Sequence, residues 1–157
     1  MMEQNLELPH LLLFAQSIGI GFLIGLERER HENAVAGLRT FTLIALAGSL
    51  AGYIRKQSAD NEVVILILGL VTASLLVAQF KSKSEDPQTT SVLAGILTFG
   101  LGYMLWVGHP VLSAGLAVFI TTLLYFRKEL RDVPRKLTKQ EIISFLQFAA
   151  IAFILLP

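Results

Sequence analysis

The chain of 157 residues has no cysteine and few charged residues. The absence of cysteine excludes disulfide bonds, thiolate metal sites and the acylation of a lipoprotein cysteine. Charged residues make up 16% of the sequence, against roughly a quarter in an ordinary soluble domain. Intrinsic disorder needs low hydrophobicity and high net charge, so a chain that is 54% apolar with a net charge of +1 is not of that class.

Apolar surface is what the sequence has in excess. Mean hydropathy is +0.63, and one domain of this length has too little interior to bury so many apolar side chains. The composition therefore indicates a membrane protein that uses the lipid bilayer as its solvent. Because a spanning helix takes about 20 residues, the chain holds at most about six spans, with no room for a separate soluble domain.

Long runs without charged residues divide the chain into predicted helices. The longest run, residues 87–126, is too long for one crossing, and the Gly-His-Pro sequence at 108–110 is a turn signal that splits it in two. We therefore predict an all-α, polytopic transmembrane bundle of five to six spans, forming a single domain over residues 1–157. The expected segments are about 8–27, 37–54, 62–80, 87–107, 110–126 and 139–157.

Basic residues are divided unequally between the two ends of this predicted bundle. One end receives eleven Lys and Arg residues, whereas the other receives only Arg55 and Lys56. Since basic residues mark the cytoplasmic side, we expect a bacterial inner-membrane protein whose N-terminus lies outside. Residues 1–5 contain no basic side chain, so we expect the first apolar run to be a retained helix and not a cleaved signal.

Glycines recur at a spacing that lets helices approach closely. The first two predicted segments each contain a pair of glycines four residues apart. Small residues at this spacing favour close backbone contact between helices in lipid. We expect these residues to pack helices within one bundle, and a seam between two copies is the alternative. The expected packing glycines are Gly21, Gly25, Gly37, Gly48 and Gly52.

Alternating charges follow the first predicted segment at residues 27–30, and Arg39 and Thr40 open the next segment on the same side of the membrane. If the first helix continues through this group, Glu29 extends the face that carries Gly25 into the bundle, with Arg28 beside it. A carboxylate and a guanidinium at such a boundary can pair bidentately. Two interpretations stay open, namely an interfacial cluster that sets orientation and a polar site at the cytoplasmic mouth of the bundle.

Candidate chemistry is sparse. Glu27, Glu29 and His31 could form a weak site for a hard cation, but these ligands are too few to predict a metal centre. The predicted spans contain no nucleophile with a base, no phosphate-binding loop and no zinc motif. We therefore expect a protein that is not an enzyme and has no cofactor. A net charge of +1 gives no bulk attraction for nucleic acid.

Two stretches of the sequence resemble the N-terminal signature of the MgtC/SapB family of bacterial inner-membrane proteins. They are Gly-x-x-x-Gly-Leu-Glu-Arg-Glu at residues 21–29 and Ala-Gly-Leu-Arg-Thr-Phe at residues 36–41. Thr89 and Thr90 also resemble the pair that begins a later helix of the family. The chain departs from the best-known members because it lacks their second glycine-rich motif and their soluble C-terminal domain. It is similar to the first half of larger, two-part membrane proteins.

The resemblance implies a role without naming a reaction. Members of the family are linked to growth at low magnesium, to intracellular survival of pathogens and to control of the membrane ATP synthase. We therefore hypothesise a protein of magnesium, ion or membrane-energy homeostasis that acts through helix association with a second copy or with a second membrane protein. The alternative is a subunit of a transporter or channel whose pathway forms on assembly. The matching functional positions are Glu27, Arg28, Glu29, Arg39 and Thr40.

The orientation can be tested with reporter fusions. Alkaline phosphatase fused after Glu62 should be active, because that junction lies outside the cytoplasm in the predicted topology. Fusion after Glu85 should give an inactive reporter. The opposite pair of activities would invert the topology.

Overall fold

The computed structural model describes residues 4–30, 36–58, 61–81, 89–126 and 139–155. The regular structure within these ranges is α-helical throughout, as the sequence predicts. The chain divides into two compact units, Met1–Leu124 and Tyr125–Pro157, and each is described by itself. The helices are α1 (Gln4–Glu29), α2 (Leu38–Ser58), α3 (Glu62–Lys81), α4 (Thr89–Trp106), α5 (Pro110–Tyr125) and α7 (Lys139–Leu155).

The first helix begins earlier than the apolar pattern indicates. It starts at Gln4 and not near residue 8, so Pro9 lies inside it. Proline removes one helical hydrogen bond, here the bond to the carbonyl of Asn5. That carbonyl lies in the first turn of α1. The helix tolerates the loss because the missing bond is at its N-terminal end and the bonds of the following turns are kept.

The long apolar run does divide into two helices at the predicted turn. Gly108 has a φ of 97°, which side chains rarely allow, and the His109 amide donates to the Met104 carbonyl at 3.2 Å. A left-handed glycine followed by this hydrogen bond is the Schellman motif that ends many helices. Pro110 then begins α5 with the backbone angle that a first helical turn requires.

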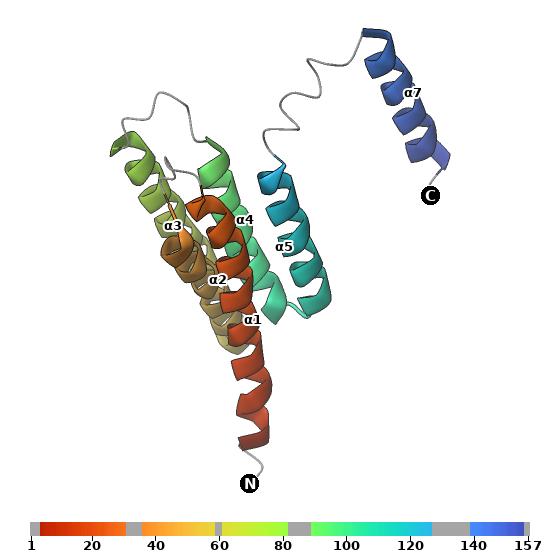
Figure 1. Ribbon diagram of the computed structural model, residues 1–157. Helices are drawn as coiled ribbons and strands as arrows, with labels where there is room; N and C mark the ends of the chain where they lie inside the picture. Colours follow the sequence, from red (N-terminus) through yellow and green to blue (C-terminus); the bar gives the residue numbers. More distant parts are fainter. Residues whose placement is uncertain (1–3, 31–35, 59–60, 82–88, 127–138, 156–157) are drawn as a thin grey trace. The chain divides into compact units, whose positions relative to one another are not determined.

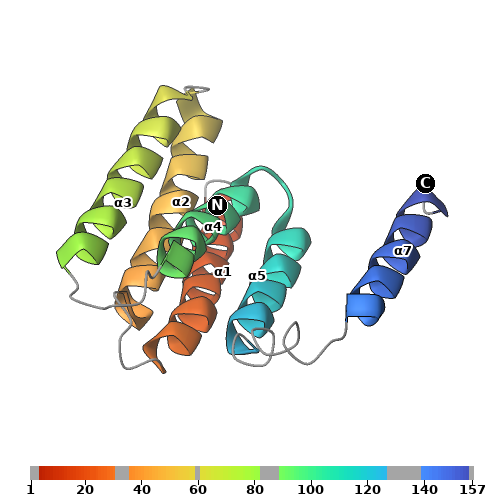
Figure 2. The ribbon, with the colours of Figure 1, turned by 90° about the horizontal axis from the view of Figure 1, so that it is seen from above.

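Helix α2 lies at the centre of the first unit. It packs most extensively against α1 and α4 and to a smaller extent against α3. Consecutive helices run in opposite directions, so α1, α3 and α5 point one way and α2 and α4 the other (Figure 1). Seen from above, α3 and α5 lie on opposite sides of the group formed by α1, α2 and α4 (Figure 2).

Glycine permits the contact between α2 and α4. A methyl group added at Gly48 of α2 would lie 2.0 Å from the carbonyl oxygen of Phe99, and one at Gly102 of α4 would lie 2.1 Å from that of Ala45. Both distances are far inside van der Waals contact. The two backbones therefore touch at positions where any side chain would separate the helices.

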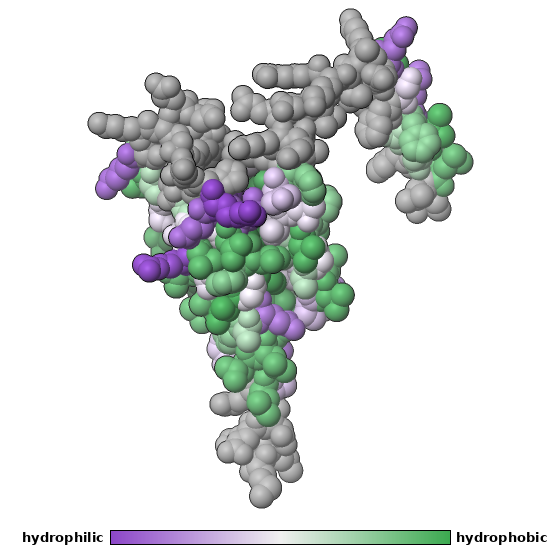
Figure 3. Space-filling model, in the orientation of Figure 1, coloured by the Kyte–Doolittle hydropathy of each residue, from purple (hydrophilic) through white to green (hydrophobic). Residues whose placement is uncertain are grey.

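The interior of the unit contains hydrogen-bonded polar side chains. Ser113 of α5 donates to the Leu101 carbonyl at 2.7 Å, and the indole nitrogen of Trp106 donates to the Ser49 hydroxyl at 2.6 Å. Both serines are fully buried, whereas many large aliphatic side chains are exposed. Hydrophobic atoms cover the flanks of the unit in Figure 3, and hydrophilic atoms gather toward one end. This distribution suits a bundle surrounded by lipid, where hydrogen bonds and close packing replace the hydrophobic effect.

Two helices in the described part of the chain are long and apolar enough to cross a membrane. They correspond to Leu8–Glu29 in α1 and to α3. Shorter apolar helices lie at Thr90–Trp106 and Pro110–Tyr125. The five to six spans expected from the sequence stay a prediction. In the second unit, α7 exposes Ile143, Phe148, Ile151 and Leu155.

Substitution of Gly48 tests whether backbone contact stabilises the unit. Gly48→Ala should lower the free energy of unfolding by about 1–3 kcal/mol, because α2 and α4 must separate to admit the methyl group. Gly100→Ala is the matched control, since a methyl group there meets no atom within 4 Å. Unfolding of the detergent-solubilised protein by titration with sodium dodecyl sulfate, followed by circular dichroism, measures the difference. Equal stability of the two variants would contradict the close contact.

Candidate functional site

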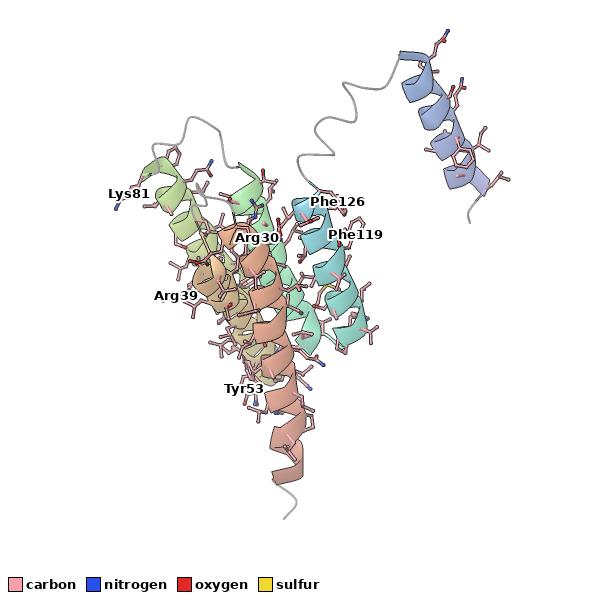
Figure 4. All side chains as sticks on the ribbon, in the orientation of Figure 1. Arg30, Arg39, Tyr53, Lys81, Phe119 and Phe126 are labelled. Carbon is pink, nitrogen blue, oxygen red and sulfur yellow. The ribbon has the colours of Figure 1, made fainter. Side chains whose placement is uncertain are left out.

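One end of the first unit collects most of its described charges, and we call it the charged end. Helices α1 and α3 finish there, and α2 and α4 begin there. Figure 4 shows Arg30, Arg39 and Lys81 toward this end and Tyr53 toward the opposite one. The described charged residues of the charged end are Glu27, Arg28, Glu29, Arg30, Arg39 and Lys81.

Arg28 joins the end of α1 to the beginning of α4. Its side chain is buried, with 5% of the residue exposed. Atom Nη2 donates to the Thr90 carbonyl at 2.8 Å, and Nη1 lies 3.5 Å from the Ser91 hydroxyl. A buried charge is costly in a low-dielectric site unless hydrogen bonds compensate for it. These acceptors provide part of that compensation and hold two helix ends together.

The position of Arg28 follows from the buried stripe of α1. Residues 17, 20, 21, 24, 25, 27 and 28 are buried, and their spacing of three and four residues defines one face of a helix. Glu27 and Arg28 therefore continue the buried face. We expected Glu29 to enter the bundle with Arg28, but Glu29 is exposed because it lies at the edge of this stripe.

Glu29 instead joins α1 to α2 at the surface. Its Oε2 atom accepts a hydrogen bond from the Leu38 amide at 2.6 Å. The first amides of a helix have no partner within the helix, and the positive end of the helix dipole favours an anion there. Glu29 is thus an N-terminal cap for α2 that comes from the preceding helix.

Gly37 makes room for this cap. A methyl group at position 37 would lie 2.6 Å from the same Oε2 atom of Glu29. Further along the same interface, methyl groups at Gly25 and Gly21 would lie 2.8 Å and 2.6 Å from the backbones of Leu38 and Thr42. Residues 21, 25 and 29 therefore face α2 at three successive turns of α1. Gly52, at the other end of α2, packs against Trp106, where a methyl group would lie 2.8 Å from Cβ.

Arg39 and Thr40 lie outside this junction. Both are exposed, and within the described residues Arg39 forms no ion pair, so the bidentate pairing considered between Glu29 and Arg39 is absent. Residues 39 and 40 lie between Leu38, which contacts α1, and the buried Phe41. Because successive helical residues point about 100° apart, these two residues point away from the interface with α1. Glu27 forms an ion pair with Arg30 at 3.9 Å.

Ser91 is a residue of the site that the sequence did not reveal. It lies 63 residues from Arg28, and no local pattern connects the two. The one signal was the resemblance of Thr89 and Thr90 to a helix start of the family, which drew attention to this region without assigning it a role.

The described carboxylates do not assemble into a metal centre. The described residues contain no group of three His, Asp or Glu side chains that could share an ion. Glu29 is bound to a backbone amide, and Glu27 faces Arg30. His31, the third weak candidate, lies outside the described residues.

Comparison with known protein families identifies a match over most of the chain. A sequence model described as the MgtC family matches residues 14–133, which include every residue of the charged end. No curated protein and no solved structure match the chain.

A double-mutant cycle tests the cap. Glu29→Ala should lower the free energy of unfolding by about 0.5–1 kcal/mol, the lower part of the range for a lost cap because the carboxylate is exposed. Gly37→Ala should have a similar effect, since its methyl group displaces the carboxylate. In the double variant the two losses should not add, because the second change removes a contact that is already gone. Full additivity would show that Gly37 and Glu29 act independently.

Proposed function

The chain belongs to the MgtC family, and from that premise we propose that it is a multi-pass inner-membrane protein that acts in magnesium, ion or membrane-energy homeostasis through contacts between helices. Family membership makes it a membrane protein. The proposal assigns it no catalysis and no cofactor.

The proposed orientation places the charged end in the cytoplasm. Arg28, Arg30, Arg39 and Lys81 lie at this end, whereas the described basic residues of the other end are Arg55 and Lys56. An excess of basic residues near the ends of spanning segments favours the cytoplasmic side. The exposed aliphatic flanks support the contact with lipid that such a topology requires.

The observation that carries the proposal is the junction of three helix ends. Arg28 ties α1 to α4, and Glu29 with Gly37 ties α1 to α2. Each tie uses a residue of the family signature for a structural purpose. The junction leaves the signature residues Arg39 and Thr40 exposed on the first turn of α2.

We therefore assign two tasks to the signature. The buried and capping residues hold the ends of α1, α2 and α4 in one arrangement. The exposed pair, Arg39 and Thr40, then contacts a partner, which is a second copy or another membrane protein. A fixed backbone favours such contacts, because less conformational entropy is lost on binding.

Growth at low magnesium tests this division. In a host that lacks its own family member, Arg39→Ala and Thr40→Ala should abolish the growth advantage while leaving the free energy of unfolding within about 0.5 kcal/mol of the wild type. Lys81→Ala removes another exposed charge at the charged end and should be neutral. If stably inserted Arg39→Ala and Glu29→Ala proteins support growth and retain partners like the wild type, the site assignment is wrong.

The native mass of the purified complex distinguishes the partners. A homo-oligomer or a co-purifying membrane chain should be seen with the wild type and lost with Arg39→Ala. Ion flux in proteoliposomes that Glu27→Gln or Glu29→Gln abolishes would instead favour the transport subunit.

A further inference from the structure

The end of the first unit opposite the charged end carries a cluster of rings, and we call it the aromatic end. Trp106 of α4 lies at its centre. The Trp106 ring centroid is 5.0 Å from that of Tyr53, 5.1 Å from that of His10 and 5.2 Å from that of Phe14. Tryptophan and tyrosine concentrate where a bundle meets the boundary between lipid and water. The ring cluster therefore indicates that α2 and α4 finish at such a boundary.

A cavity of about 280 Å³ opens beside the ring cluster. Gly52 and Trp106 contribute to its wall, and the absence of a side chain at Gly52 lets the tryptophan lie against α2. Arg55 is half-buried and Lys56 is exposed, so one wall can be reached from water. The cavity is lined by Gly52, Arg55, Lys56, Trp106 and Val107.

Aromatic groups hold both cations. The Arg55 guanidinium donates from Nη1 to the Tyr103 hydroxyl, and its carbon lies 5.7 Å from the centroid of that ring. The Lys56 ammonium lies 5.9 Å from the centroid of Trp106. Among the described residues neither cation forms an ion pair with a carboxylate. Aromatic faces attract a cation but carry no net charge, so the positive charge remains.

The helix dipoles offset only part of this charge. Basic residues in the last turn of a helix interact favourably with its negative end, which explains one cation at the end of α2. The carboxyl ends of α2 and α4 together amount to roughly one negative elementary charge. Two cations exceed that value. Glu62 begins α3 at the same end of the unit, but it does not line the cavity, so the cavity wall carries two cations and no carboxylate.

We propose that this cavity binds a phosphate-bearing anion, with Arg55 and Lys56 as its ligands and Trp106 as its wall. Arginine has five N–H donors in a planar fork, and the bond to Tyr103 occupies one of its nitrogens. The volume is near the lower limit of small-molecule sites, about 300 Å³, and suits a head group more than a large ligand. The phosphate comes from an anionic lipid or from free phosphate, and the site is separate from the residues that carry the proposed function.

The single tryptophan of the chain makes the test direct, because Trp106 is itself part of the cavity wall. The purified full-length chain in neutral detergent is titrated with dihexanoyl phosphatidylglycerol, with inorganic phosphate and with dihexanoyl phosphatidylcholine, while tryptophan fluorescence is recorded. A saturable change with phosphatidylglycerol alone assigns a lipid, and one with inorganic phosphate assigns a free anion. Either result supports the site. No saturable change with either anionic probe, or an equal response to phosphatidylcholine and phosphatidylglycerol without a response to phosphate, overturns it.

Charge-matched variants locate the response. Arg55→Gln combined with Lys56→Gln should weaken the apparent affinity by at least about tenfold, because charge-assisted hydrogen bonds are lost. Lys56→Gln alone should weaken it severalfold, and this exposed position keeps the test valid if the double variant fails to fold. Arg30→Gln combined with Lys81→Gln removes the same charge at the charged end and should leave affinity unchanged. Wild-type affinity in Lys56→Gln, or equal losses in both double variants, would overturn the proposal.

Discussion

Backbone contact between α2 and its two main neighbours is the constraint on which the rest of the first unit depends. Gly48 and Gly102 bring α2 against α4, and Gly21 and Gly25 bring α1 against α2. In lipid the hydrophobic effect does not drive helices together, so dispersion contacts and hydrogen bonds must do so. Both act over short distances, and small residues at the contact are therefore the condition for every other interaction in the unit.

The charged end is a consequence of that approach. Because α1 lies directly on α2, the Glu29 carboxylate can reach the first amide of α2. Because α4 lies close to the same helices, the buried Arg28 can reach Thr90 and Ser91. The charges of the motif thus have unequal surroundings. One is buried and bound to the backbone, one caps a helix at the surface, and Arg39 remains exposed for other contacts.

The charged side chains at the two ends of the unit have different kinds of partner. At the charged end, the Glu29 carboxylate caps the first amide of α2, and Glu27 pairs with Arg30. At the aromatic end, two cations are held by the rings of Tyr103 and Trp106 and keep their positive charge. Inside the unit, buried Ser113 joins α5 to α4, and buried Ser49 joins α2 to Trp106 of α4. Hydroxyl groups at these positions provide directional bonds that lipid cannot replace.

Composition and local pattern determined the class of protein, the approximate limits of the described helices and the turn at residues 108–110. These features depend on neighbours in the sequence, through the length of apolar runs and the conformational preferences of glycine and proline. Local periodicity also indicated that residues 21, 25 and 29 share a face. It did not show that the buried face of α1 includes Glu27 and Arg28, because the burial of these two residues depends on the position of α4.

Only the tertiary structure decided the partners. Arg28 of α1 meets residues of α4 more than sixty positions away, Glu29 binds the first amide of α2, and Arg55 of α2 meets Tyr103 of α4. The family signature marked several of these positions without explaining them. Each contact depends on the distance and rotation between packed helices. These are set by the sum of all the interhelical contacts, and no single stretch of sequence contains them.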